Sequence, residues 1–130
     1  MKHLITTCYG RVSKLPKGTK LVQTSNGAPD FMSRMGSLFE PDLTPEAFRN
    51  KTDFRVEYPK QLERLHRSGK LKQIVDRLPD GSALLCYEKD HCDCHRKILA
   101  EYLTSHGLAN VTEFQVIEPA KPANPQMSLL

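Results

Sequence analysis

The densest group of chemically active side chains in this 130-residue chain lies between residues 84 and 96. Its sequence is Leu84-Leu85-Cys86-Tyr87-Glu88-Lys89-Asp90-His91-Cys92-Asp93-Cys94-His95-Arg96. Cys86 or Cys94 could act as a nucleophile or line a pocket, and Glu88 could act as a general acid or base. His95 and Arg96 could hold an anion, because both donate hydrogen bonds to phosphate or carboxylate oxygens. These five residues are the candidate catalytic residues.

A predicted strand and a predicted helix position this segment. Residues 82–87 are continuously apolar and follow a Pro-Asp-Gly turn, which predicts a central strand buried on both faces. Helically spaced apolar residues follow the segment, with Gly107 as the C-cap: Ile98, Leu99, Tyr102 and Leu103. In open α/β sheets, ligands bind outside the carboxyl ends of strands, where the next helix presents unpaired N–H groups. This placement favours a phosphate or carboxylate ligand and the thiolate form of Cys94.

The remaining patterns predict the rest of an α/β domain. Short β-like runs cover residues 3–8, 20–24 and 111–117. A helix is predicted to start at Thr44, and two apolar stripes over 58–65 and 71–78 are separated by Gly69. The order strand, strand, helices, strand, helix, strand favours parallel pairing. We expect a small three-layer α/β domain over residues 1–117, with a mostly parallel sheet, flanking helices and a long functional loop over 25–42.

The segment around Cys86 and Arg96 resembles the YeaO-like proteins, the family of the domain of unknown function 488. The resemblance rests on Leu-Leu-Cys-Tyr-Glu-Lys over residues 84–89, followed by Cys-His-Arg over 94–96 at the start of a helix. Residues 6–10, 24–29 and 40–41 are also similar, so the resemblance covers roughly residues 3–117. It implies an α/β fold with an active or ligand-binding site at this element, and no reaction is established for the family.

Structural and metal-binding roles are alternatives for the same residues. A cysteine on a buried strand is often a small core residue. His95 and Arg96 could cap the helix and pair with acids such as Glu88 or Glu101. The thiols and imidazoles over 86–95 could hold zinc or iron, but their Cys-x-Cys-His spacing differs from the paired ligands of structural zinc sites. We therefore expect no metal and no other cofactor.

The last five residues, Gln126-Met127-Ser128-Leu129-Leu130, look like the pentapeptide by which bacterial polymerases and repair proteins bind the DNA sliding clamp. All five positions fit the pattern of Gln, Leu or Met, Ser or Asp, Leu, and Phe or Leu. Leu129 and Leu130 would anchor the peptide in an apolar cleft, and Gln126 would form hydrogen bonds at its rim. Residues 118–130 are predicted to be a flexible tail, whose Pro-rich spacer reaches on the order of 15–20 Å. The alternative is a frayed end that happens to contain two leucines.

Composition limits the location and the partners of the protein. Apolar residues make up 38% and charged residues 26% of the chain. No apolar run approaches the roughly 20 residues that cross a bilayer, and no signal-peptide core is visible, so we expect a cytoplasmic protein without a membrane partner. The four cysteines then favour reduced thiols over a disulfide framework. A net charge of +4 permits contact with nucleic acid without requiring it.

These observations together predict a DNA- or nucleotide-processing protein. Residues 126–130 would recruit it to the bacterial sliding clamp, and the Cys86–Arg96 element would bind a phosphate or a base. One alternative is a non-catalytic clamp binder, encoded by a bacterium or a phage, that modulates replication or repair. The other is a thiol- or metal-sensing domain built on the cysteines.

Overall fold

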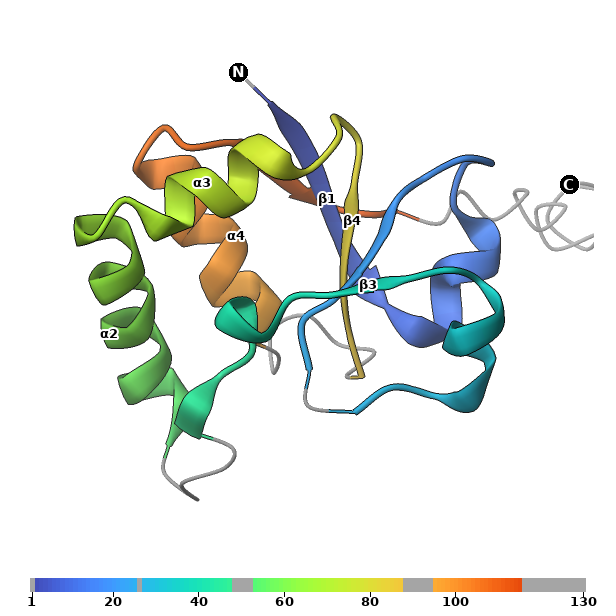
Figure 1. The fold of residues 1–130 in the computed structure, drawn as a ribbon, viewed down its shortest axis with the longest axis horizontal. Helices are drawn as coiled ribbons and strands as arrows, with labels where there is room; N and C mark the ends of the chain where they lie inside the picture. The colour runs from blue at the N-terminus through green and yellow to red at the C-terminus, as the bar shows by residue number, and fades with distance from the viewer. Residues whose placement is uncertain (1, 26, 48–52, 88–94, 116–130) are drawn as a thin grey trace, which may run out of the picture.

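The computed structural model describes residues 2–25, 27–47, 53–87 and 95–115, and Figure 1 shows its fold. Five strands form one sheet in the order β3-β2-β4-β1-β5, and every neighbouring pair is parallel. The strands are β1 (His3–Cys8), β2 (Leu21–Gln23), β3 (Leu38–Phe39), β4 (Ala83–Cys86) and β5 (Asn110–Glu113). The prediction of an α/β fold with a parallel sheet is confirmed.

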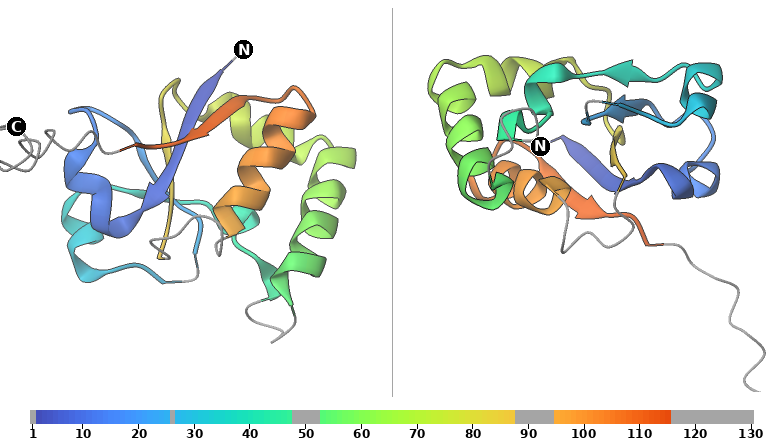
Figure 2. Two further views of the ribbon diagram at one scale, coloured as in Figure 1. Left: turned by 180° about the vertical axis from the view of Figure 1, so that it is seen from behind. Right: turned by 90° about the horizontal axis from the view of Figure 1, so that it is seen from below.

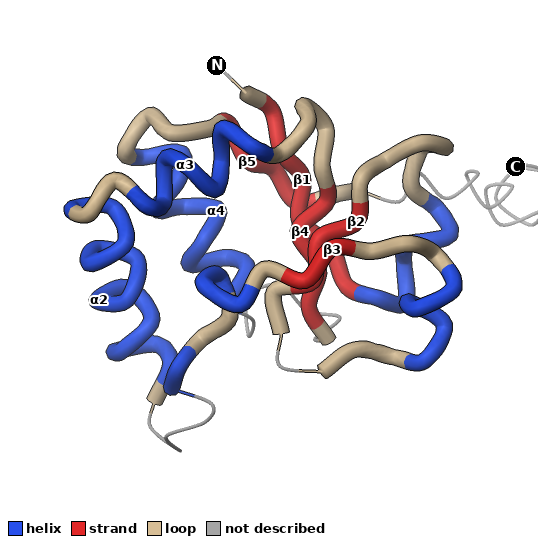
Figure 3. Tube along the Cα trace, in the orientation of Figure 1, coloured by secondary structure: helices blue, strands red, loops and turns tan. Residues whose placement is uncertain are grey.

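The sheet is the middle of three layers. Helices α2 (Phe54–Arg67), α3 (Lys70–Arg77) and α4 (His95–Ser105) lie on one side of it, as Figures 2 and 3 show. The short 3-10 helices η1 (Tyr9–Lys14) and η2 (Asp30–Arg34) lie on the other side, and η3 (Pro41–Leu43) follows β3. None of the helices in the described ranges is long and apolar enough to span a membrane.

Two apolar clusters hold the layers together. The larger one lies between the sheet and α2, α3 and α4, and it includes Leu84. The smaller one lies between the sheet and the 3-10 helices, and it includes Ala83 and Leu85. Neighbouring residues of β4 therefore face opposite clusters, and all four residues of the strand are buried. This confirms the expectation that the strand is central and buried on both faces, which its unbroken apolar sequence predicts.

The predicted helix boundaries agree with the structure. Gly69 has a φ of +79° between α2 and α3, a conformation that glycine adopts without the strain of a Cβ atom. Gly107 follows α4 with a φ of +69°, as expected for a C-cap. Glu46 and Ala47 are helical, and the rest of the helix predicted from Thr44 lies outside the described residues.

The prediction of a structureless loop over residues 25–42 is wrong. This segment contains η2, β3 and the first part of η3. Strand β3 has only two residues, and Leu38 and Phe39 are 41% and 46% exposed. A strand this short shows no alternation of apolar and polar residues, so only its pairing with β2 reveals it. The tail predicted over residues 118–130 lies outside the described part of the chain.

Candidate functional site

The carboxyl ends of all five strands meet at one edge of the sheet, because the strands are parallel. Cys86 ends β4 at this edge, and His95 begins the next described helix, α4. The structure therefore places Cys86, His95 and Arg96 at the predicted junction of strand and helix. Glu88 and Cys94 lie outside the described residues, and so do the clamp-binding residues Gln126, Met127, Ser128, Leu129 and Leu130.

His95 is a buried, neutral imidazole. It is 1% exposed, and its Nε2 lies 3.1 Å from the Thr24 hydroxyl. That hydroxyl donates its single hydrogen to the Leu85 carbonyl, so Nε2 is the donor toward Thr24. The Tyr58 ring packs edge-on against the imidazole with 5.4 Å between the ring centroids. Burial lowers the pKa of His95 to about 4, so the side chain carries no charge toward an anion at neutral pH.

Arg96 is fully buried and ties α4 to the end of β5. Its Nε and Nη2 donate to the two carboxylate oxygens of Glu113, at 3.0 and 2.9 Å. The hydroxyl of Thr6 donates to the same carboxylate at 2.8 Å, and Arg11 lies 3.9 Å from it. The two-pronged contact fixes the guanidinium plane at the start of α4.

The structure pairs Arg96 with Glu113, an acid that the sequence analysis did not name. Glu88, one of the acids offered there as an alternative partner, lies outside the described residues. Strand β5 lies beside β1, and this position brings Glu113 to the carboxyl edge near the start of α4. The order of strands in the sheet, which the local sequence does not encode, decides this pairing.

Cys86 is disulfide-bonded, and its side chain is fully buried. The expectation of reduced thiols is therefore wrong at this residue. Cys8 lies opposite Cys86 in the register of β1 and β4, and it is free. Nη1 of Arg96 lies 2.9 Å from the Cys86 sulfur.

The other face of the same edge carries hydroxyl groups that the sequence analysis did not single out as site residues. The phenol of Tyr9 and the hydroxyl of Ser25 are 2.6 Å apart. The ring of Tyr87 packs edge-on against Tyr9 with 4.9 Å between centroids. Tyr87 is 53% exposed, whereas Tyr9 is buried, and this burial raises the pKa of the Tyr9 phenol. Tyr87 is the last residue of one predicted strand, and Tyr9 and Ser25 each lie one residue beyond another, which was the available sequence signal.

Thr7 lies next to this group, one row further into the sheet. Ile5, two residues earlier in β1, packs in the cluster that contains Tyr9, so strand alternation puts Thr7 on the same face. Thr7 is fully buried, and its hydroxyl has no hydrogen-bond partner in the described part of the chain. A buried hydroxyl without a partner costs about 1–3 kcal/mol, which a ligand or a bound water would recover.

The fold and this edge can now be compared with known proteins. Residues 33–103 match the family described as Domain of unknown function DUF488. The chain belongs to this family. The DUF488 match begins after β2 and ends in α4, so it contains Cys86, His95 and Arg96 but not Thr7, Tyr9 or Ser25. No curated protein and no solved structure matches the chain.

Metal binding was considered for the thiols and imidazoles of this edge. Within residues 2–25, 27–47, 53–87 and 95–115, no group of three or more His, Cys, Asp or Glu side chains could hold a metal ion. His91, Cys92 and Cys94 lie outside these ranges.

Proposed function

We propose that the carboxyl edge of the sheet binds a nucleotide, and that the protein is a DNA- or nucleotide-processing protein held at the sliding clamp by residues 126–130. The observation that carries the nucleotide-binding proposal is the group formed by Thr7, Tyr9, Ser25 and Tyr87. It combines the buried Thr7 hydroxyl, which has no partner among the described residues, with an exposed aromatic ring on one face of the edge.

One hydroxyl of this group, that of Thr7, has a donor hydrogen available to a phosphate. Serine, threonine and tyrosine hydroxyls are common donors to the phosphate oxygens of nucleic acids. The Ser25 hydroxyl donates to the Gly27 carbonyl at 2.6 Å, so it accepts from the Tyr9 phenol in the contact between them. The Thr7 hydroxyl has its donor hydrogen unused among the described residues. A phosphate oxygen that enters at this edge would accept that hydrogen.

The ring of Tyr87 suits a base. It is held on one side by its edge-on contact with Tyr9, and about half of its surface is exposed. A Cβ atom built on Gly27 would lie 3.9 Å from the Tyr87 hydroxyl, so the loop after β2 runs beside the ring. Aromatic rings bind unstacked bases by stacking, with little preference for sequence.

The direction of β5 supports the link to the clamp-binding peptide. Strand β5 is parallel to β1, and the Phe114 N–H donates to the Thr6 carbonyl at 2.8 Å. The chain therefore leaves the sheet at the edge that carries the site, and Phe114 lies twelve residues before Gln126 by the sequence numbering. A tether attached at this edge would keep the site near clamp-bound DNA and raise its local concentration there.

Nucleotide binding can be tested with deoxyadenosine monophosphate and inorganic phosphate as probes, followed by NMR of the amide groups. The Tyr87→Leu variant should weaken nucleotide binding roughly 5- to 150-fold and leave phosphate binding unchanged, because only the base stacks on the ring. Phe39→Leu is the matched control, since Phe39 is an aromatic residue of similar exposure on β3. Equal nucleotide affinity of the Tyr87→Leu variant and the original protein would contradict the proposal.

Clamp binding requires a separate experiment. The full chain and a version that ends at Pro125 would be compared for binding to a bacterial sliding clamp, with Leu129→Ala/Leu130→Ala as a variant of full length. Binding by the full chain alone supports recruitment to DNA replication or repair. If all three bind equally, or none binds, the peptide does not recruit the protein.

A further inference from the structure

A cavity lies away from the carboxyl edge of the sheet. It lies between α3 and the segment 38–42, which contains β3 and leads into η3. Its volume is about 990 Å³, and we refer to it as the α3–β3 groove. Volumes of roughly 300–1,000 Å³ are typical of small-molecule sites. Lys20 and Pro79, which precede β2 and β4, line one end of it, so the groove opens toward the amino ends of these strands.

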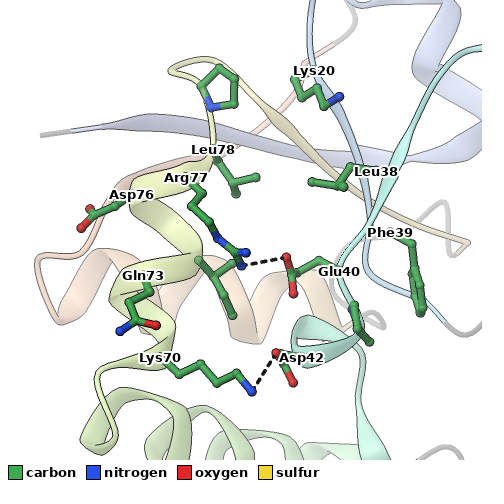
Figure 4. Close-up of a pocket in the computed structure, with 13 residues that line it drawn as sticks. Lys20, Leu38, Phe39, Glu40, Asp42, Lys70, Gln73, Asp76, Arg77 and Leu78 are labelled. Carbon is green, nitrogen blue, oxygen red and sulfur yellow. Dashed lines mark hydrogen bonds and ion pairs between the residues drawn. The ribbon is translucent and has the colours of Figure 1, made fainter.

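Opposite charges face each other across the groove, as Figure 4 shows, and Asp76 of α3 adds an acid to the wall that carries Lys70 and Arg77. Glu40 and Asp42 lie on the wall of residues 38–42, and Arg77 and Lys70 face them from α3. The Arg77–Glu40 distance is 3.5 Å, and the Lys70–Asp42 distance is 3.3 Å. Both partners of the Lys70–Asp42 pair are exposed, so this pair contributes little stability and a ligand could replace it at low cost. Glu40 is buried, so a ligand that displaces Arg77 from it has to supply a positive charge in its place.

Glu40 and Arg77 differ in how firmly they are held. The backbone N–H of Glu40 donates to the Gln23 carbonyl at 3.0 Å, and its carbonyl accepts from Leu43 and from the Thr44 hydroxyl. Its side chain is 10% exposed, whereas the side chain of Arg77 is 67% exposed. The carboxylate is therefore fixed in the wall, while the guanidinium can turn toward a ligand. Burial raises the pKa of Glu40, which indicates that Arg77 does not fully compensate the desolvation of the carboxylate.

Apolar side chains lie beside the charged pair. Leu38 and Leu78 point toward one another next to the Glu40–Arg77 contact, and Ile74 of α3 lines the same cavity. Leu38 is 41% exposed, so it offers apolar surface that a ligand could cover.

We infer that the α3–β3 groove binds a free α-amino acid with an apolar side chain. The ammonium group would lie against Glu40, the carboxylate would bind Arg77, and the side chain would cover Leu38 and Leu78. An α-amino acid carries its ammonium and carboxylate groups on the same carbon atom, which matches two opposite charges that face each other across one groove. This site is separate from the nucleotide site, and neither proposal depends on the other.

The test uses L-leucine as the probe and the full chain, with binding followed by NMR of the amide groups. Leucine should shift the amides of residues 38–42 and 70–78. Glu40→Gln should weaken leucine binding about tenfold or more, because a charge-assisted hydrogen bond is lost. Glu57→Gln is the matched control, since Glu57 is an acid on α2 that pairs with Lys60 and does not line the groove. It should leave binding unchanged.

Modified probes assign each charge to its partner. N-acetyl-L-leucine lacks the ammonium group, so it should bind the original protein weakly. The Glu40→Gln substitution should not lower the affinity for this probe any further. L-leucine amide lacks the carboxylate, and Arg77→Met should not weaken its binding further. Arg77 is mostly exposed, so this second variant keeps its fold even if Glu40→Gln does not. The inference would be overturned if millimolar leucine shifted none of the amides of residues 38–42 and 70–78. It would also be overturned if Glu40→Gln weakened the binding of N-acetyl-L-leucine as much as that of L-leucine, and Arg77→Met weakened the binding of L-leucine amide as much as that of L-leucine.

Discussion

The buried neutral state of His95 predicts how the stability of the protein depends on pH. The imidazole has a pKa of about 4 in the folded protein and about 6.5 in an unfolded chain. Between these values the unfolded chain binds a proton that the folded protein excludes, so falling pH favours unfolding. The effect begins near pH 6.5 and is complete near pH 4.

The size of the effect follows from the difference between the two pKa values. One pKa unit corresponds to about 1.4 kcal/mol, so His95 should remove about 3 kcal/mol of unfolding free energy over this interval. Small domains have only about 5–15 kcal/mol in total, so the loss is large enough to measure. Its physical causes are the burial of the imidazole and, to a smaller extent, the nearby charge of Arg96.

The assay is urea unfolding over a pH series for the original protein and for His95→Gln. The glutamine amide does not titrate, and its Nε2 can donate to the Thr24 hydroxyl as the imidazole does. The unfolding free energy of the original protein should fall by about 3 kcal/mol more than that of the variant between pH 7 and pH 4. A difference that stays constant across this interval would refute the assignment of a buried neutral imidazole.

Three further predictions concern Thr7 and Arg96 at the site and Gly69 between α2 and α3, and each is tested by urea unfolding. Thr7→Val should stabilise the protein by about 1 kcal/mol, because it removes a buried hydroxyl that has no partner among the described residues. The same variant should weaken phosphate binding. A loss of stability would show that the hydroxyl is satisfied. Arg96→Met should lower the unfolding free energy by about 3–5 kcal/mol, because it leaves Glu113 without its main partner. Adding Glu113→Gln should recover part of this loss. Equal stability of the single variant and the original protein would contradict the buried ion pair. Gly69→Ala should cost about 1–2 kcal/mol because of the positive φ, while Gly69→Asn should cost less; equal effects of both would argue against strain as the cause.

Much of the fold could be read from local patterns in the sequence. The unbroken apolar run of β4 predicts its burial on both faces, and Gly69 and Gly107 mark where helices end. These features depend on residues close together in the chain, since strand burial and helix capping are determined by a few neighbouring side chains. Strand β3 escaped prediction because two residues carry no periodic signal.

For the candidate site, too, the sequence predicted the local elements, and the tertiary structure decided the contacts between them. The sequence by itself determined that a strand ends close to Cys86 and that a helix carries His95 and Arg96 soon after it. Only the tertiary structure decided that Arg96 binds Glu113, that His95 faces Thr24, and that Tyr9, Ser25 and Tyr87 form one group. These contacts join residues from 16 to 78 positions apart in the sequence, and the order of parallel strands brings them together. A short sequence pattern specifies its own strand or helix, but it does not specify which neighbour that element will have in the sheet.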